Sequence, residues 1–164
     1  MVRWIKLFGS QYLGVWGLGL LLFALQEIPY MVMPLIPLET NPIMNMQETS
    51  AVLDLCEKIL GSLCVALMTF VVHENASLFS VREPSEKLFF LLAAAVLAAN
   101  FVGWALYFTG RQSVFVMMFF IVLLPPLYYV LIGLWRKNIC LTVAGGLFLA
   151  VHFLHVLGNL KGNP

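Results

Sequence analysis

Charged residues are scarce in this sequence, and their scarcity argues against an ordinary soluble domain. Only 10% of the 164 residues are Asp, Glu, Lys or Arg, whereas 62% are apolar. Soluble domains have about 25% charged and roughly 45 to 50% apolar residues. A chain this short has too little interior to enclose so much apolar surface, so much of it must face lipid. The composition therefore predicts a multi-pass integral protein of the cell membrane, with the lipid bilayer as a partner.

Basic runs, cysteine pairs and specific motifs are lacking as well. The net charge is +1 and there is no basic tail, so we expect no nucleic-acid partner. The three cysteines form no CxxC motif, and Cys56 and Cys64 stand about 12 Å apart along one predicted helix, too far for a disulfide. Phosphate-binding loops, nucleophile elbows and zinc signatures are missing too. We therefore expect no cofactor and no metal ion, and the sequence leaves open whether the protein is an enzyme.

Five apolar stretches are long enough to cross a membrane, because a spanning helix needs about 20 residues. They cover approximately residues 7–28, 51–72, 87–109, 114–135 and 138–159. The first is too long for the core of a signal peptide, so we expect an uncleaved span. Short connections after the third and fourth stretches make their neighbours antiparallel. The sequence thus predicts an all-α fold, in which residues 1–164 form a single integral membrane domain of five transmembrane helices.

Prolines interrupt this pattern in two places. Between the first two stretches stand Pro29, Pro34, Pro37 and Pro42, too many for a continuous helix. We expect an irregular, proline-rich apolar segment over residues 29–38, on the outer side of the membrane and packed over the bundle. Pro125 and Pro126 break the fourth stretch near its middle, where we expect a static kink, with a hinge as the alternative.

Basic residues at the ends of the stretches predict the orientation in the membrane. The N-terminal side holds Arg3, Lys6, Arg82, Lys87, Arg136 and Lys137, and the opposite side holds Arg111 and Lys161. Cytoplasmic loops carry an excess of Lys and Arg. We therefore expect the N-terminus inside and the C-terminus outside.

Polar residues from four of the five stretches are expected at one depth, in the outer half of the membrane. Counting about 1.5 Å per residue from the stretch ends gives this depth, and spacings of three, four and seven place the polar groups of each helix on one face. A charge at the centre of a spanning helix costs roughly 2.5 to 3.5 kcal/mol, so such groups usually face the bundle interior or a wet cavity. We predict a polar cavity whose ligand-binding residues are Glu27, Asp54, Glu57, Lys58, Asn100, Tyr107, His152 and His155.

This cavity predicts a protein that binds or transports a small amphipathic or cationic molecule, or a lipid. Its excess of carboxylates favours a cation, and its histidines would make occupancy depend on pH. Two alternatives stay open: an intramembrane enzyme doing acid–base chemistry on a lipid or sterol-like substrate, and a non-catalytic subunit of a larger membrane complex. Asp54 and Lys58 could also form a simple ion pair at the membrane boundary, and His152 with His155 could ligate a divalent metal. One bundle of five helices leaves little room for conduction, so association into a homo-oligomer is also open.

Overall fold

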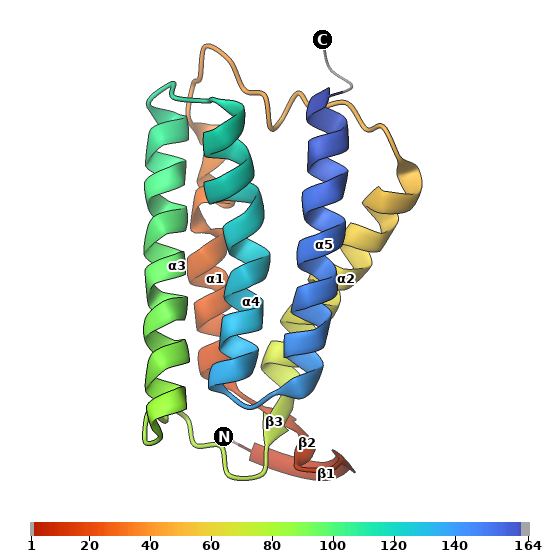
Figure 1. The fold of residues 1–164 in the computed structure, drawn as a ribbon, viewed down its shortest axis with the longest axis vertical. Coiled ribbons are helices and arrows are strands. Elements are labelled where there is room, and N and C mark those ends of the chain that lie inside the picture. The colour runs from red at the N-terminus through yellow and green to blue at the C-terminus, as the bar shows by residue number, and fades with distance from the viewer. Residues whose placement is uncertain (1, 162–164) are drawn as a thin grey trace.

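The protein is a helical bundle with a small three-stranded sheet at one end (Figure 1). The computed structural model describes residues 2–161. We call the end that carries the strands the sheet end. The opposite end, where residues 36–50 join two helices, is the loop end.

The N-terminal residues form two strands. β1 (Val2–Phe8) turns back at Gly9, whose φ of +49° suits a tight turn, into β2 (Gln11–Val15). β3 (Val71–His73) pairs antiparallel with β2 and completes the sheet in the order β1-β2-β3. The prediction of a helix beginning near residue 7, and with it an entirely α fold, is therefore wrong here. An apolar run alone does not distinguish a strand from a helix, and the turn at Gly9 lets this run fold back as a hairpin.

The first helix begins and ends later than predicted. α1 (Gly17–Val32) continues through Pro29 and is extended by a 3-10 turn, η1 (Met33–Leu35). A single proline removes only one backbone hydrogen bond, and apolar helices packed in a bundle tolerate that loss. The irregular segment therefore occupies residues 36–50 and not residues 29–38.

Three further helices begin at or near the predicted positions. α2 (Ala51–Phe70) starts at Ser50, whose hydroxyl accepts a hydrogen bond from a backbone N–H of the first turn. α3 (Pro84–Phe108) has a proline in its first turn, where the missing N–H costs nothing. α5 (Ile139–Lys161) follows Asn138, whose buried amide donates to two carbonyls at the end of α2. This amide fixes the start of α5 against the end of α2.

The fourth helix changes its hydrogen-bonding pattern before the two prolines. η2 (Val116–Leu123) is a π-helix, and it continues as α4 (Leu124–Trp135). In a π-helix each N–H bonds to the carbonyl five residues earlier. Pro125 and Pro126 have no N–H, so this pattern leaves the carbonyls of residues 120 and 121 without a donor.

Side chains from two other helices satisfy these carbonyls. The amide of Asn100 donates to the carbonyl of Phe120 at 2.7 Å, and the hydroxyl of Tyr30 donates to that of Ile121 at 3.1 Å. These two bonds tie α3 and α1 to the fourth helix at the break before the prolines.

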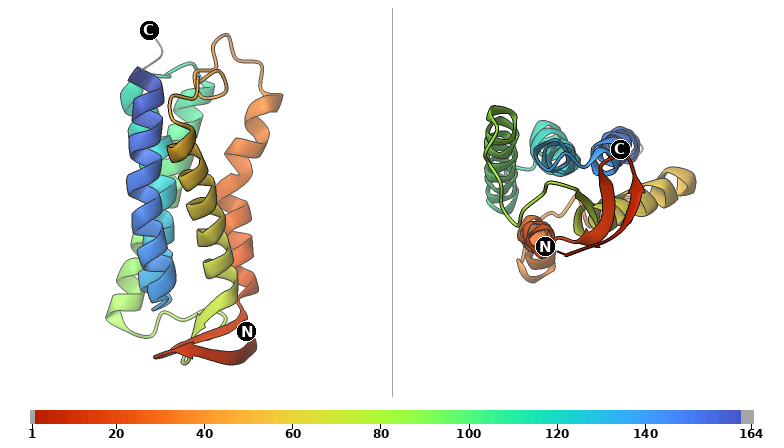
Figure 2. Two further views of the ribbon diagram at one scale, coloured as in Figure 1. Left: turned by 90° about the vertical axis from the view of Figure 1, so that its right-hand side faces the viewer. Right: turned by 90° about the horizontal axis from the view of Figure 1, so that it is seen from below.

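The helices form two layers. α3, α4 and α5 stand in a row, and α1 and α2 cover one side of it (Figure 2). The N-terminal strand and the C-terminal end of α5 lie at opposite ends of the bundle (Figure 1). Among the residues that the structure describes, four helical segments are long and apolar enough to cross a membrane: Gly17–Leu35, Pro84–Phe108, Val116–Trp135 and Ile139–Lys161. α2 has 20 residues but carries three charged residues near its start.

Candidate functional site

A cluster of carboxylates and histidines joins α2 to α5 toward the loop end. Glu57 lies nearly two turns beyond the start of α2, and His152 and His155 stand three residues apart on the facing side of α5. The Nδ1 atom of His152 lies 3.1 Å from Oε1 of Glu57, and Nδ1 of His155 bonds to the other oxygen of the same carboxylate. One carboxylate of α2 therefore contacts both histidines of α5, as the spacing predicts.

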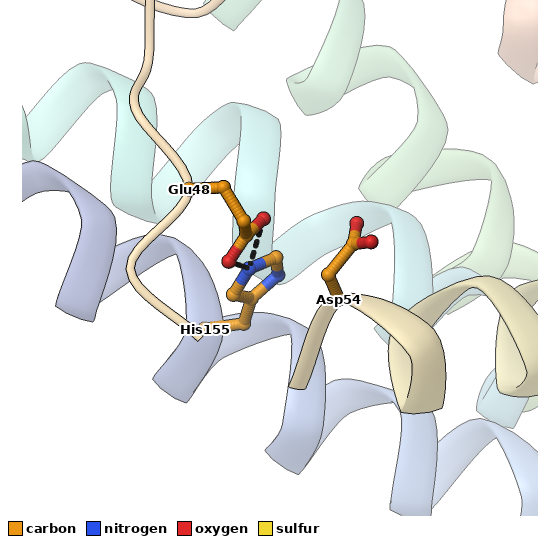
Figure 3. A group of neighbouring side chains, drawn as sticks. All are labelled: Glu48, Asp54 and His155. Atoms are coloured by element: carbon orange, nitrogen blue, oxygen red, sulfur yellow. Dashed lines mark hydrogen bonds and ion pairs between the residues drawn. The ribbon is translucent and has the colours of Figure 1, made fainter. Parts of the chain in front are cut away.

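Glu48 extends this cluster from the irregular segment. Its two carboxylate oxygens lie 2.8 and 2.9 Å from Nε2 of His155 (Figure 3). This hydrogen bond is the main cause that lowers the pKa of Glu48, and the backbone N–H of Ser50 donates to the same carboxylate. Sequence reasoning missed Glu48 because the residue precedes the helix. Its position two residues before the Ser50 cap is the signal that could have found it.

Asn159 holds the end of the irregular segment against α5. Its Oδ1 accepts hydrogen bonds from the backbone N–H of Thr49 at 2.9 Å and from the Thr49 hydroxyl at 2.6 Å. Its Nδ2 lies 3.1 Å from Nε2 of His155. Because Asn159 is only 4% exposed, these bonds are shielded from water and fix Glu48 beside the imidazole.

Asp54 and Lys58 border the cluster without entering the cavity beside it. Donor atoms of Asp54, Glu48 and His155 all lie within 4.8 Å of one another, so these three side chains could hold a metal ion. The Asp54 carboxylate already pairs with Nζ of Lys58 at 2.7 Å. The side chain of Lys58 is 71% exposed, so this lysine points away from the bundle interior. The pair is the simple i, i+4 ion pair that the sequence offered as an alternative.

A cavity of about 290 Å³ adjoins the cluster on the side of His152. It lies between α1, α2, α4 and α5, and it is lined by Phe23, Gln26, Glu27, Tyr30, Gly61, Ser62, Val65, Pro125, Tyr129, Phe148 and His152. The imidazole of His152 packs against Phe148, with ring centroids 5.3 Å apart, which fixes it in the cavity wall. The walls are mainly aromatic and apolar, with a few polar groups from three helices.

Two polar side chains of α1 face this cavity without a partner. Glu27 makes no hydrogen bond or ion pair with any residue in the described range 2–161. Gln26 is 2% exposed, and its Oε1 has no hydrogen-bond donor among the same residues. An unsatisfied buried acceptor costs about 1 to 3 kcal/mol. A carboxylate and an amide oxygen are thus both available to a ligand that carries positive charge or N–H donors.

Asn100 and Tyr107 do not reach the cluster or the cavity. The amide of Asn100 is bonded to the fourth helix, as described above. Tyr107 is buried and accepts a hydrogen bond from the N–H of Ile43 at 3.1 Å, and it donates to Oδ1 of Asn41 at 2.7 Å. Asn100 and Tyr107 therefore hold neighbouring segments of the chain, and the prediction that they line the site with the histidines does not match their positions.

The arrangement supports two kinds of chemistry. The cavity can bind a small molecule through an unpaired carboxylate and aromatic walls, and the Glu57–His152 contact offers a proton donor or acceptor at its edge. A scan against protein-family models, a search of curated proteins and a search of solved structures found no match for this chain. The proposed function therefore rests on the geometry of the site.

Proposed function

We propose that this chain spans the cell membrane five times, with the N-terminus and the sheet end on the cytoplasmic side. α2 supports this reading because it is long enough to span and packs against α1 and α5 inside the same bundle. Its charged first turns lie at the loop end, where Lys58 can reach water. The strands and the α4–α5 connection bring Arg3, Lys6, Arg136 and Lys137 to the sheet end, as the positive-inside rule requires.

We propose that the cavity binds a small organic cation that has an apolar part. The observation that carries this proposal is Glu27, a carboxylate with no counter-charge in the described chain, set among aromatic side chains. None of the described residues that line the cavity is Lys or Arg. A bound cation would neutralise Glu27. It would also be attracted to the faces of the aromatic rings, and each such contact contributes about 0.5 to 2 kcal/mol.

Two other polar groups of the cavity, from Gln26 and His152, narrow the chemical class of the proposed ligand. Gln26 offers an amide oxygen to an N–H group of the ligand. His152 stands at the cavity wall and would repel a cation when its ring is protonated. These groups favour an amine or a quaternary ammonium compound as the ligand.

Binding of benzyltrimethylammonium to the purified protein in lipid nanodiscs tests this proposal. This probe keeps its charge at every pH, and it carries one aromatic ring. We expect Glu27→Gln to weaken its affinity roughly tenfold or more, because the cation loses its carboxylate counter-charge in the cavity. Glu39→Gln is the matched control, since Glu39 is an exposed carboxylate of the irregular segment. Equal affinities of wild type and Glu27→Gln would refute the role of Glu27.

The Glu57–His152 contact favours a second candidate, an intramembrane enzyme that performs acid–base chemistry on a lipid or sterol-like substrate. Product formation that is lost in Glu57→Gln or His152→Ala while binding persists would select the enzyme. Flux of an unchanged molecule across proteoliposomes would select a transporter. A non-catalytic subunit, whether of a larger complex or of a homo-oligomer, would bind no small molecule in the cavity when purified alone.

A further inference from the structure

We propose that Glu48, His155, Glu57 and His152 form a proton pathway between the water at the loop end and the cavity. A cation that enters the cavity is then exchanged for a proton that leaves along this pathway. The inference rests on the proposed binding of a cation. It adds the coupling ion and the route by which that ion moves.

The pathway begins in water. The side chain of Glu48 is 41% exposed, whereas that of His155 is 6% exposed. Both carboxylate oxygens of Glu48 lie within 2.9 Å of Nε2 of the imidazole. An exposed carboxylate in contact with a buried imidazole is a natural entry point, because it exchanges protons with water on one side and with the ring on the other.

The pathway continues through Glu57 to the cavity. His155 contacts Glu57 with its second ring nitrogen, so protons can enter the ring on one side and leave on the other. The second oxygen of Glu57 lies 3.1 Å from Nδ1 of His152, which lines the cavity. The angle of this last contact lies outside hydrogen-bond geometry, so the His152 ring must rotate slightly to transfer a proton.

Each transfer moves one proton, and His155 ends in its other neutral tautomer, so its ring must turn over before the next proton can follow the same route. His152 gives its Nδ1 proton to Oε1 of the Glu57 carboxylate, the carboxyl group rotates, and the same proton then passes to Nδ1 of His155. The imidazole of His155 releases its Nε2 proton to Glu48, which passes a proton to water. The net result is one proton moved from His152 to the water at the loop end, while the cation replaces its charge in the cavity.

Charged and titratable side chains of α1, α2 and α4 surround the pathway. From α2, Asp54 stands beside His155 and Glu48 and is paired with Lys58. From α1, Glu27 and Tyr30 share the cavity with His152, and Tyr129 of α4 lies in the same wall. The only cationic side chain among these neighbours is Lys58, which points outward. An incoming cation therefore meets two groups of the cavity wall that exchange protons, Glu27 and His152.

Titration calorimetry of benzyltrimethylammonium in two buffers of different ionisation enthalpy measures the exchange. The probe has no proton of its own to release. We expect roughly one proton released per cation bound near the histidine titration range. His73→Gln, which changes the histidine at the sheet end, should leave this number unchanged. Binding of the probe without proton release would overturn the exchange and leave the proposed cation binding intact.

Stopped-flow measurement with a pH-indicator dye tests the route. Gln keeps the oxygen of Glu48 that accepts from His155 but cannot carry a proton. We expect Glu48→Gln to slow proton release roughly tenfold or more while probe affinity stays close to wild type, and Glu48→Asp to restore part of the rate. Unchanged release kinetics in Glu48→Gln would show that protons leave by another route.

Histidine-selective ¹⁵N NMR of the ligand-free protein separates failure of the pathway from failure of the proposed function. Groups that share a proton titrate as a unit. We expect the signals of His152 and His155 to shift together with pH, and Glu57→Gln to separate the two titrations. Coupled titrations without any binding of the probe would refute the proposed cation but support the pathway. Independent titrations in the wild type would refute the pathway.

Discussion

At the scale of single residues, the His155 imidazole connects three segments at the loop end: α5, α2 and the irregular segment. Each ring nitrogen faces a carboxylate from a different segment, Glu57 on α2 and Glu48 on the irregular segment. Asn159, on the same helix, accepts two hydrogen bonds from Thr49. One buried ring and one buried amide of α5 thus fix the chain that enters α2.

The attachment of Glu48 should weaken at acidic pH. Hydrogen bonding to His155 lowers the pKa of Glu48 below its ordinary value of 4.5. A carboxylate with a depressed folded-state pKa contributes stability above its unfolded pKa, and this contribution is lost as the pH falls through the folded value. We expect the melting temperature of Glu48→Gln to lie below that of the wild type at neutral pH. The difference should shrink as the pH drops from about 4.5.

Thermal denaturation followed by circular dichroism, at pH values from about 3 to 8 in steps of about one pH unit, measures this difference in melting temperature. Glu39→Gln serves as the control, because this exposed carboxylate of the same segment does not contact His155. A constant offset between Glu48→Gln and the wild type at every pH would contradict the assignment.

Some residue contacts could be predicted from the sequence and others could not. The spacing of His152 and His155, and their depth relative to Glu57, follow from helix geometry alone. The bond of Asn100 to the fourth helix depends on which carbonyls the prolines leave free. That detail is set by the π-helical pattern and by helix packing, which a single sequence does not specify.

At the scale of elements, close approach of α3 to the π-helix depends on Gly103. A β-carbon at this position would stand 2.1 Å from Cβ of Phe120. We expect Gly103→Ala to lower the free energy of unfolding by about 1 to 3 kcal/mol, because the two helices must move apart. Thermal denaturation in detergent measures this loss.

Gly146→Ala on α5 is the matched control for this substitution. A β-carbon at Gly146 meets nothing within 4 Å, and alanine favours a helix over glycine by roughly 0.5 to 1 kcal/mol. We therefore expect Gly146→Ala to be neutral or stabilising. Equal melting temperatures for Gly103→Ala and the wild type would contradict the close approach.

The N-terminal elements show why some of the fold could not be predicted. Residues 7–15 are apolar enough to continue α1, but they form a hairpin because β3 offers a pairing edge more than 50 residues later in the chain. Such a long-range partner leaves no local signal. The later helices, bounded by caps and short turns, agree with the sequence within a few residues.

At the scale of the whole molecule, five spans would place the loop end and the sheet end on opposite sides of the membrane. Impermeant maleimide labelling of intact cells tests this arrangement in a variant without Cys56, Cys64 and Cys140. We expect Glu39→Cys to be labelled from outside and Asn75→Cys only after permeabilisation, because these exposed residues lie at opposite ends. Labelling of both from one side would contradict five spans. The reverse pattern would contradict only the orientation.

Native mass spectrometry of the pure protein tests the cavity itself, without a chosen probe. The wild type and Glu27→Gln would be purified identically and released gently from lipid nanodiscs. We expect the wild type to retain a small organic cation that Glu27→Gln does not retain. Retention of the same molecules by both proteins, or of none by the wild type, would contradict a cation site at Glu27.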